Sequence, residues 1–145
     1  MKEKFEILEQ IHHDSSMAVY TIEKLMEKLK DKDNKIKSLI EEILDEYKDF
    51  EAESRKILEE NNKEVSTPSM MSKMGSAMGV SKEVNEDNSD SAMADMLIQG
   101  ISMGSIEIEK KLNEFEKDLD KEHKKLAKEF LKFQEKTIDN LKEYL

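Results

Sequence analysis

The stretch SMMSKMGSAMG, residues 69–79, lies between two long charged segments and decides how the chain folds back on itself. It holds four methionines, two glycines and a single charge, at Lys73, whereas 40% of the whole chain is charged. The segments on either side carry apolar residues at helical spacing. A stretch of low charge between such helices is expected to lie on their surface.

The connection around this stretch, residues 65–90, is far longer than a turn requires. Connections between helices in bundles usually take about 2–8 residues. Thr67 followed by Pro68 is typical of a helix start, with the threonine as N-cap, and predicts a short helix over 68–84. As a mostly helical segment the connection would reach roughly 37 Å at 1.5 Å per residue. We therefore expect a crossover, after which the third long helix runs parallel to the second.

Four long helices are predicted around this crossover, over about 4–30, 34–63, 91–118 and 120–145. In the turn DKDN, Asp33 or Asn34 is expected to cap the second helix. The boundary near 118–120 contains no Gly or Pro, so one continuous helix there is the main alternative. Four such amphipathic helices predict an all-α, single-domain four-helix bundle over 1–145. A pair of helical hairpins that must dimerise is the second choice.

The composition excludes several classes of function. The formal net charge of −10 opposes binding to nucleic acid or to anionic lipid. No stretch approaches the roughly 20 apolar residues of a membrane span. The absence of cysteine excludes disulfides, thiol catalysis and thiolate metal sites. The first ten residues lack the apolar core of a signal peptide, so a cytoplasmic protein is expected.

The run MADMLIQGISMGSIEIEKKLNEF, residues 93–115, is similar to a set of small uncharacterised ferritin-like proteins from Gram-positive bacteria. Four long helices with a long segment between the second and third also resemble the ferritin-like superfamily over nearly the whole chain. The resemblance implies a ferritin-like bundle and carries no established activity. Ferritin-like oxidases hold two metals with a Glu from each of two helices and a Glu-x-x-His from each of the other two.

That metal-binding pattern is incomplete in this chain. Glu9 and His12 form one Glu-x-x-His, and Asp120 with His123 forms a variant, but the second and third helices contain no histidine. Glu9, His12 and His123 are therefore weak candidates for a metal ion, and no cofactor is expected. His12 is expected to face inward and to contact a carboxylate.

The middle of the bundle, where a diiron site would lie, is expected to hold packed aromatic side chains. These are Tyr47 and Phe50 on the second helix and Phe130 and Phe133 on the fourth. The carboxylates near the same level, Glu46, Glu109 and Glu129, are expected on the surface.

The sequence predicts a non-enzymatic protein that acts through its helix surfaces, as a homo-oligomer or with a protein partner. The expected interaction surface is the set Met70, Met71, Met74 and Met78, because methionine is an adaptable side chain at binding surfaces. Two alternatives remain open. One is a divergent metal-binding or redox protein, and the other is a carrier of a small apolar ligand beside Gly100 and Gly104.

Overall fold

The computed structural model describes residues 3–145, and this part of the chain is all-helical, with no strand. Its elements are α1 (Glu3–Lys28), α2 (Lys37–Glu60), α3 (Met70–Glu86), α4 (Asp90–Phe115), the 3-10 turn η1 (Glu116–Asp118) and α5 (Lys121–Lys142). The four long helices and the short one that the sequence predicts are all present, with boundaries that differ by a few residues. Residues 1 and 2 of the predicted domain lie outside the described part.

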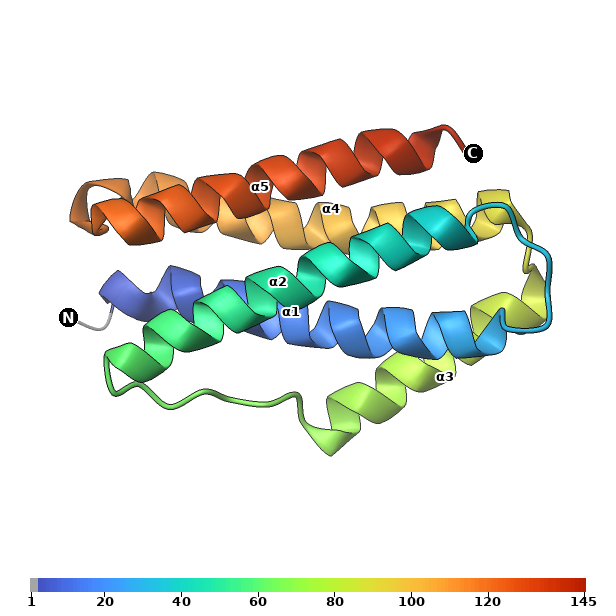
Figure 1. The fold of residues 1–145 in the computed structure, drawn as a ribbon, viewed down its shortest axis with the longest axis horizontal. Helices are drawn as coiled ribbons and strands as arrows, with labels where there is room; N and C mark the ends of the chain where they lie inside the picture. The colour runs from blue at the N-terminus through green and yellow to red at the C-terminus, as the bar shows by residue number, and fades with distance from the viewer. Residues whose placement is uncertain (1–2) are drawn as a thin grey trace.

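The path of the chain reverses four times, between α1 and α2, between α2 and the segment that leads into α3, between α3 and α4, and between α4 and α5 (Figure 1). Helices α1 and α2 are antiparallel, and an extended segment followed by α3 then carries the chain back along α1. Helix α4 therefore runs in the same direction as α2, and α5 runs parallel to α1. The ring centroids of Phe5 and His123 lie 5.5 Å apart, which places the starts of α1 and α5 at one end. These are the helix directions that the long connection predicts.

Helices α4 and α5 are separate. After Phe115 the chain forms η1, and Leu119 then adopts an extended conformation, with φ −81° and ψ 139°. Asp120 is also extended and precedes the first residue of α5. The two helices can therefore pack against each other as an antiparallel pair, although no Gly or Pro marks the turn.

The start of α3 differs from the sequence prediction. Thr67 is not the N-cap; instead the Ser69 hydroxyl accepts a hydrogen bond from the backbone N–H of Ser72 at 3.0 Å. Pro68 precedes the helix instead of occupying its first turn. Serine ranks above threonine as an N-cap residue. The helix therefore begins two residues later than expected.

The start of α2 is capped by a residue from another helix. We expected Asp33 or Asn34 to cap it, and neither does. The Asp90 carboxylate, at the beginning of α4, accepts hydrogen bonds from the backbone N–H of Lys35 at 3.2 Å and of Ile36 at 3.4 Å. It also accepts from the Asn34 side-chain amide at 2.9 Å. This contact joins the starts of α2 and α4.

Aromatic side chains from α2 and α5 fill the middle of the bundle, as the sequence predicts. Ring centroids lie 4.9 Å apart for Tyr47 and Phe133 and 5.0 Å apart for Phe50 and Phe130, in edge-to-face arrangements. Such pairs contribute about 0.5–1.5 kcal/mol beyond their buried area. Across residues 3–145, no helix is both long and apolar enough to cross a membrane.

Candidate ligand-binding site

The weak metal candidates on α1 do not converge. Glu9 is exposed, whereas His12 is buried and its Nε2 lies 3.3 Å from Glu51 Oε1. Glu51 also pairs with Arg55. Burial lowers the pKa of His12, and the Arg55 charge lowers it further. His12 is therefore an inward histidine that contacts a carboxylate, as expected.

The third candidate, His123, is buried at the start of α5 with its ring against Phe5. In the part of the chain that the structure describes, no three His, Cys, Asp or Glu side chains lie close enough together to hold a metal ion. Glu46, Glu109 and Glu129 are exposed, as expected for surface carboxylates.

The four methionines of the predicted interaction surface are solvent-exposed, at 60 to 84% of their full accessibility. They lie on α3, whose fully buried residues are Val80 and Val84. Toward α1, the Thr21 and Ser76 hydroxyls are hydrogen-bonded and Lys73 lies over the Tyr20 ring at 5.5 Å. Helix α3 thus contacts α1 through a small face and presents its methionines to solvent.

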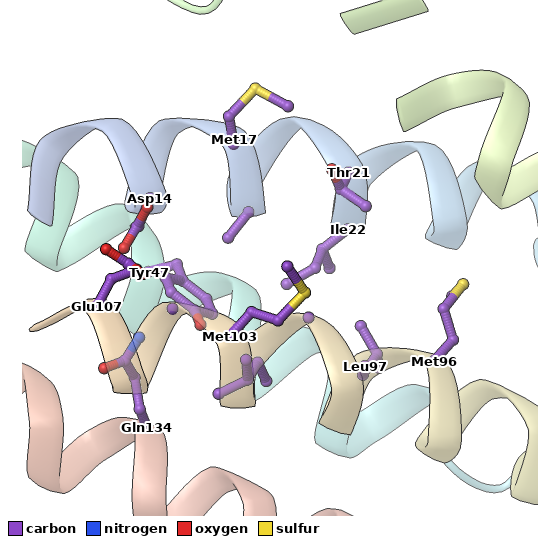
Figure 2. A pocket seen from close by; sticks show the side chains of 14 residues that line it. Asp14, Met17, Thr21, Ile22, Tyr47, Met96, Leu97, Met103, Glu107 and Gln134 are labelled. Carbon is purple, nitrogen blue, oxygen red and sulfur yellow. The ribbon is translucent and has the colours of Figure 1, made fainter. Parts of the chain in front are cut away.

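A cavity of about 390 Å³ lies mainly between α1 and α4, beside Gly100 and Gly104 (Figure 2). Its apolar walls come from Met17, Ala18, Ile22, Met96, Leu97, Ile101 and Met103. A Cβ built at Gly100 would meet nothing within 4 Å. The space that the alternative of an apolar-ligand carrier requires is therefore present beside Gly100.

Polar side chains gather at one end of this cavity. Asp14, Tyr47, Glu107 and Gln134 line it, one from each of α1, α2, α4 and α5. Figure 2 shows all four at the same end, with Ile22, Leu97 and Met96 toward the other. The cavity therefore has an apolar body and a polar end.

Two oxygens at the polar end lack partners. Asp14 Oδ1 accepts a hydrogen bond from Gln10 Nε2 at 2.9 Å, but Asp14 Oδ2 has no partner among the described residues. Gln134 is only 1% exposed, and its Oε1 likewise finds no partner within residues 3–145. A buried acceptor without a hydrogen bond costs about 1–3 kcal/mol. Neither oxygen has a hydrogen bond within the described chain that would offset its burial.

The environment of this end shifts the protonation of its groups. Burial raises the pKa of Asp14 to about 6, and the nearby Glu107 charge raises it as well. The Gln10 hydrogen bond, His13 and Lys111 act in the opposite direction. Burial and the Asp14 charge raise the pKa of Tyr47, a hydrogen bond with the Gln134 side chain acts in the opposite direction, and the Tyr47 hydroxyl stays neutral.

Gly104 gives these polar groups room to approach α4. A Cβ at this position would lie 3.1 Å from Gln134 Nε2 and 3.5 Å from Asp14 Oδ2. The first distance is tighter than ordinary van der Waals contact, so any larger residue would push the Gln134 amide away. The observed arrangement of the polar end therefore requires a glycine at position 104.

The sequence prediction located the glycines and missed Asp14, Tyr47 and Gln134 as a polar group. One signal for it is present: Asp14 lies three residues after Ile11 and four before Ala18, within the apolar stripe of the first helix. Gln134 similarly lies between Phe133 and Ile138 in the last helix. A polar residue within an apolar stripe indicates a buried polar contact.

Comparison of the chain with models of protein families, with curated proteins and with solved structures finds no match in any of the three. The geometry of the cavity and of the helix surfaces is therefore the basis for inferring a function.

Proposed function

We propose that this protein is a non-enzymatic helical bundle that binds a small, largely apolar molecule in the cavity between α1 and α4. The observation that carries this proposal is an apolar cavity ending at two unpaired buried oxygens, Asp14 Oδ2 and Gln134 Oε1. Its volume of about 390 Å³ falls within the 300–1,000 Å³ of typical ligand pockets. Apolar walls supply affinity, and the few polar groups fix orientation.

The residues around the opening favour an adaptable binding site. Met103 is 72% exposed, and Met17 is partly exposed on the opposite helix. Methionine side chains are flexible and polarizable, so they can adjust to the shape of a ligand. Gly100, which also lines the cavity, has no side chain, so α4 leaves open space at this position.

A substitution that fills the cavity tests this function. The probe is the neutral fluorescent compound N-phenyl-1-naphthylamine, whose emission increases in an apolar environment. We expect the wild-type protein to bind it and Gly100→Leu to lose binding, because the leucine side chain would occupy the cavity. Gly79→Leu is the matched control, since a Cβ at Gly79 also meets nothing within 4 Å but this glycine is on α3, outside the cavity.

The outcome separates cavity binding from adsorption to the surface. If Gly79→Leu loses as much binding as Gly100→Leu, or if the wild-type protein binds no probe, this function is wrong. Circular dichroism of each variant establishes that the helices remain folded.

We also propose that the bundle is ferritin-like. One long crossover between the second and third long helices is typical of ferritin-like folds. The parallel directions of α2 and α4 support this relationship. An experimental structure in which α2 and α4 are antiparallel would contradict it.

A second candidate function is protein binding through α3, with another copy of this chain as the first partner to test. It is favoured by the exposure of Met70, Met71, Met74 and Met78 on one short helix. Single exposed apolar residues are normal, but a contiguous group of them marks an interaction site.

Light scattering coupled to size-exclusion chromatography tests this second function. We expect the wild-type protein to form an oligomer and the triple substitution Met71→Gln, Met74→Gln and Met78→Gln to make it monomeric. Met103→Gln is the control, because this methionine is equally exposed but lies on α4. A monomeric wild-type protein across the concentration range would contradict homo-oligomer formation.

A further inference from the structure

We infer that the ligand of the cavity carries a cationic, hydrogen-bond-donating head group, such as the ammonium of an alkyl or arylalkyl amine, which binds between Asp14 and Gln134 with its apolar tail toward Ile22 and Leu97. This inference rests on the proposed ligand-binding function and names the class of ligand.

The unpaired atoms set the chemistry of the head group. Asp14 Oδ2 and Gln134 Oε1 are both hydrogen-bond acceptors, and both lack a partner within the described chain. An acceptor is satisfied only by a donor, and an ammonium group supplies three donors. Figure 2 shows the two side chains at the same end of the cavity, one from α1 and one from α5. The Gln134 amide now turns its Nε2 toward Gly104, so a rotation of this amide is needed for a single head group to contact both acceptors.

The charges lining the cavity select a cation over an anion. The described lining residues include two carboxylates, Asp14 and Glu107, and no lysine or arginine. Lys111 is near enough to influence Asp14, but it pairs with Glu6 at 3.9 Å and does not line the cavity. A carboxylate head, as in a fatty acid, would face two like charges in a partly desolvated site, which is unfavourable.

The length of the cavity sets the length of the tail. Asp14 and Ile22 lie eight residues apart on one helix, which corresponds to about 12 Å at 1.5 Å per residue. Apart from Thr21, whose hydroxyl is hydrogen-bonded to Ser76, the lining residues between and opposite them are apolar or small. A linear tail of medium length therefore lies along the cavity, with its far end against Ile22 and Leu97.

Three compounds with the same tail provide the test: n-octylamine, 1-octanol and octanoate. Binding is followed by the NMR signals of methionine methyl groups, because Met17, Met96 and Met103 line the cavity while the α3 methionines report binding elsewhere. We expect octylamine to bind about tenfold more tightly than octanol, which corresponds to 1.4 kcal/mol, and octanoate to bind more weakly than both.

Asp14→Asn is the decisive variant, because it keeps the size of the side chain and removes its charge. We expect it to reduce octylamine affinity to that of octanol and to leave octanol affinity unchanged. Glu109→Gln is the control for the general attraction of a cation to a chain of net charge −10, since Glu109 is exposed and outside the cavity. It should leave all three affinities unchanged.

The pH dependence of octylamine affinity provides an independent test. The groups near Asp14 are Gln10 and His13 on α1, Tyr47 on α2, Glu107 and Lys111 on α4, and Gln134 on α5. Because Asp14 must be ionised to attract the ammonium, octylamine affinity should rise between about pH 5 and 7.5, and octanol affinity should not.

The outcomes distinguish this inference from the function on which it rests. If octanol and octylamine bind equally, or if Asp14→Asn leaves the preference for octylamine intact, the head-group inference is wrong and the cavity remains a ligand site. Octanoate binding as tight as that of octylamine also overturns it. If no compound shifts the cavity methionines, the proposed function fails as well.

Discussion

At the scale of single residues, Asp14 reduces stability at neutral pH. Its pKa is raised to about 6 in the folded protein from 3.8, so the native state holds this proton more tightly than the unfolded chain. Stability is therefore lost as the pH rises from about 4 through 6, and the full cost, on the order of 2–3 kcal/mol, is present above that range.

Asp14→Asn should remove this cost. In urea unfolding at several pH values, we expect the variant to gain stability over wild type as the pH rises from 4 to 7, with little difference at pH 4. Asp95→Asn, an exposed position on α4, should show no such trend. A constant difference between Asp14→Asn and wild type across this range would contradict the raised pKa.

The two glycines beside the cavity should respond differently to alanine. Gly100→Ala should increase the free energy of unfolding by about 1 kcal/mol, because alanine favours the helix and its Cβ meets nothing within 4 Å. Gly104→Ala should gain less, because its Cβ would press on the Gln134 amide at 3.1 Å. Urea unfolding of both variants checks this order, and an equal or larger gain at Gly104 would show that the amide moves at no cost.

Asp90→Ala should destabilise the protein more than its position on the first turn of α4 alone would suggest. The substitution leaves the Lys35 and Ile36 N–H groups and the Asn34 amide without their acceptor. We expect a loss of about 1–2 kcal/mol in urea unfolding, as for other helix caps. Asp95→Ala is the control, because Asp95 accepts only from Gln99 on its own helix among the hydrogen bonds of the described chain. Equal losses would show that the cap contributes nothing.

At the scale of elements, α3 should be the least stable helix. Its fully buried side chains are only Val80 and Val84, and Gly75 and Gly79 reduce its helical propensity. Hydrogen exchange measured by mass spectrometry should show α3 exchanging before α1, α2, α4 and α5. Val80→Ala should accelerate exchange in α3 and leave α5 unchanged. Protection of α3 equal to that of α5 would contradict this order.

At the scale of the whole molecule, the parallel directions of α1 and α5 are directly measurable. The chain contains no cysteine, so introduced pairs can be spin-labelled without interference. Labels at Glu9 and Lys125 should lie closer together than labels at Glu9 and Asp139, by up to about 20 Å for 14 residues of helix. All three positions are exposed. The reverse order would place α1 and α5 antiparallel and exclude the crossover.

The sequence predicts the helices and their directions because periodicity and connection length depend on neighbouring residues. It predicts the aromatic layer for the same reason. Tyr47 and Phe50 share one face of α2, and Phe130 and Phe133 share one face of α5. The cap of α2 was mispredicted because its acceptor, Asp90, is 54 residues or more away in the chain. The polar end of the cavity was missed for a similar reason: each helix contributes a single residue, with no spacing that connects them.

The contact of Asp90 with the start of α2 also has a consequence for protein synthesis. A nascent chain that has left the ribosome as far as Glu60 contains all of α1 and α2 but not the carboxylate that caps α2. Water must occupy those N–H groups until Asp90 emerges and α4 docks. The hairpin of α1 and α2 therefore reaches its final form only after most of the chain has been translated. The second half of the protein supplies the hydrogen-bond acceptor that the start of α2 requires.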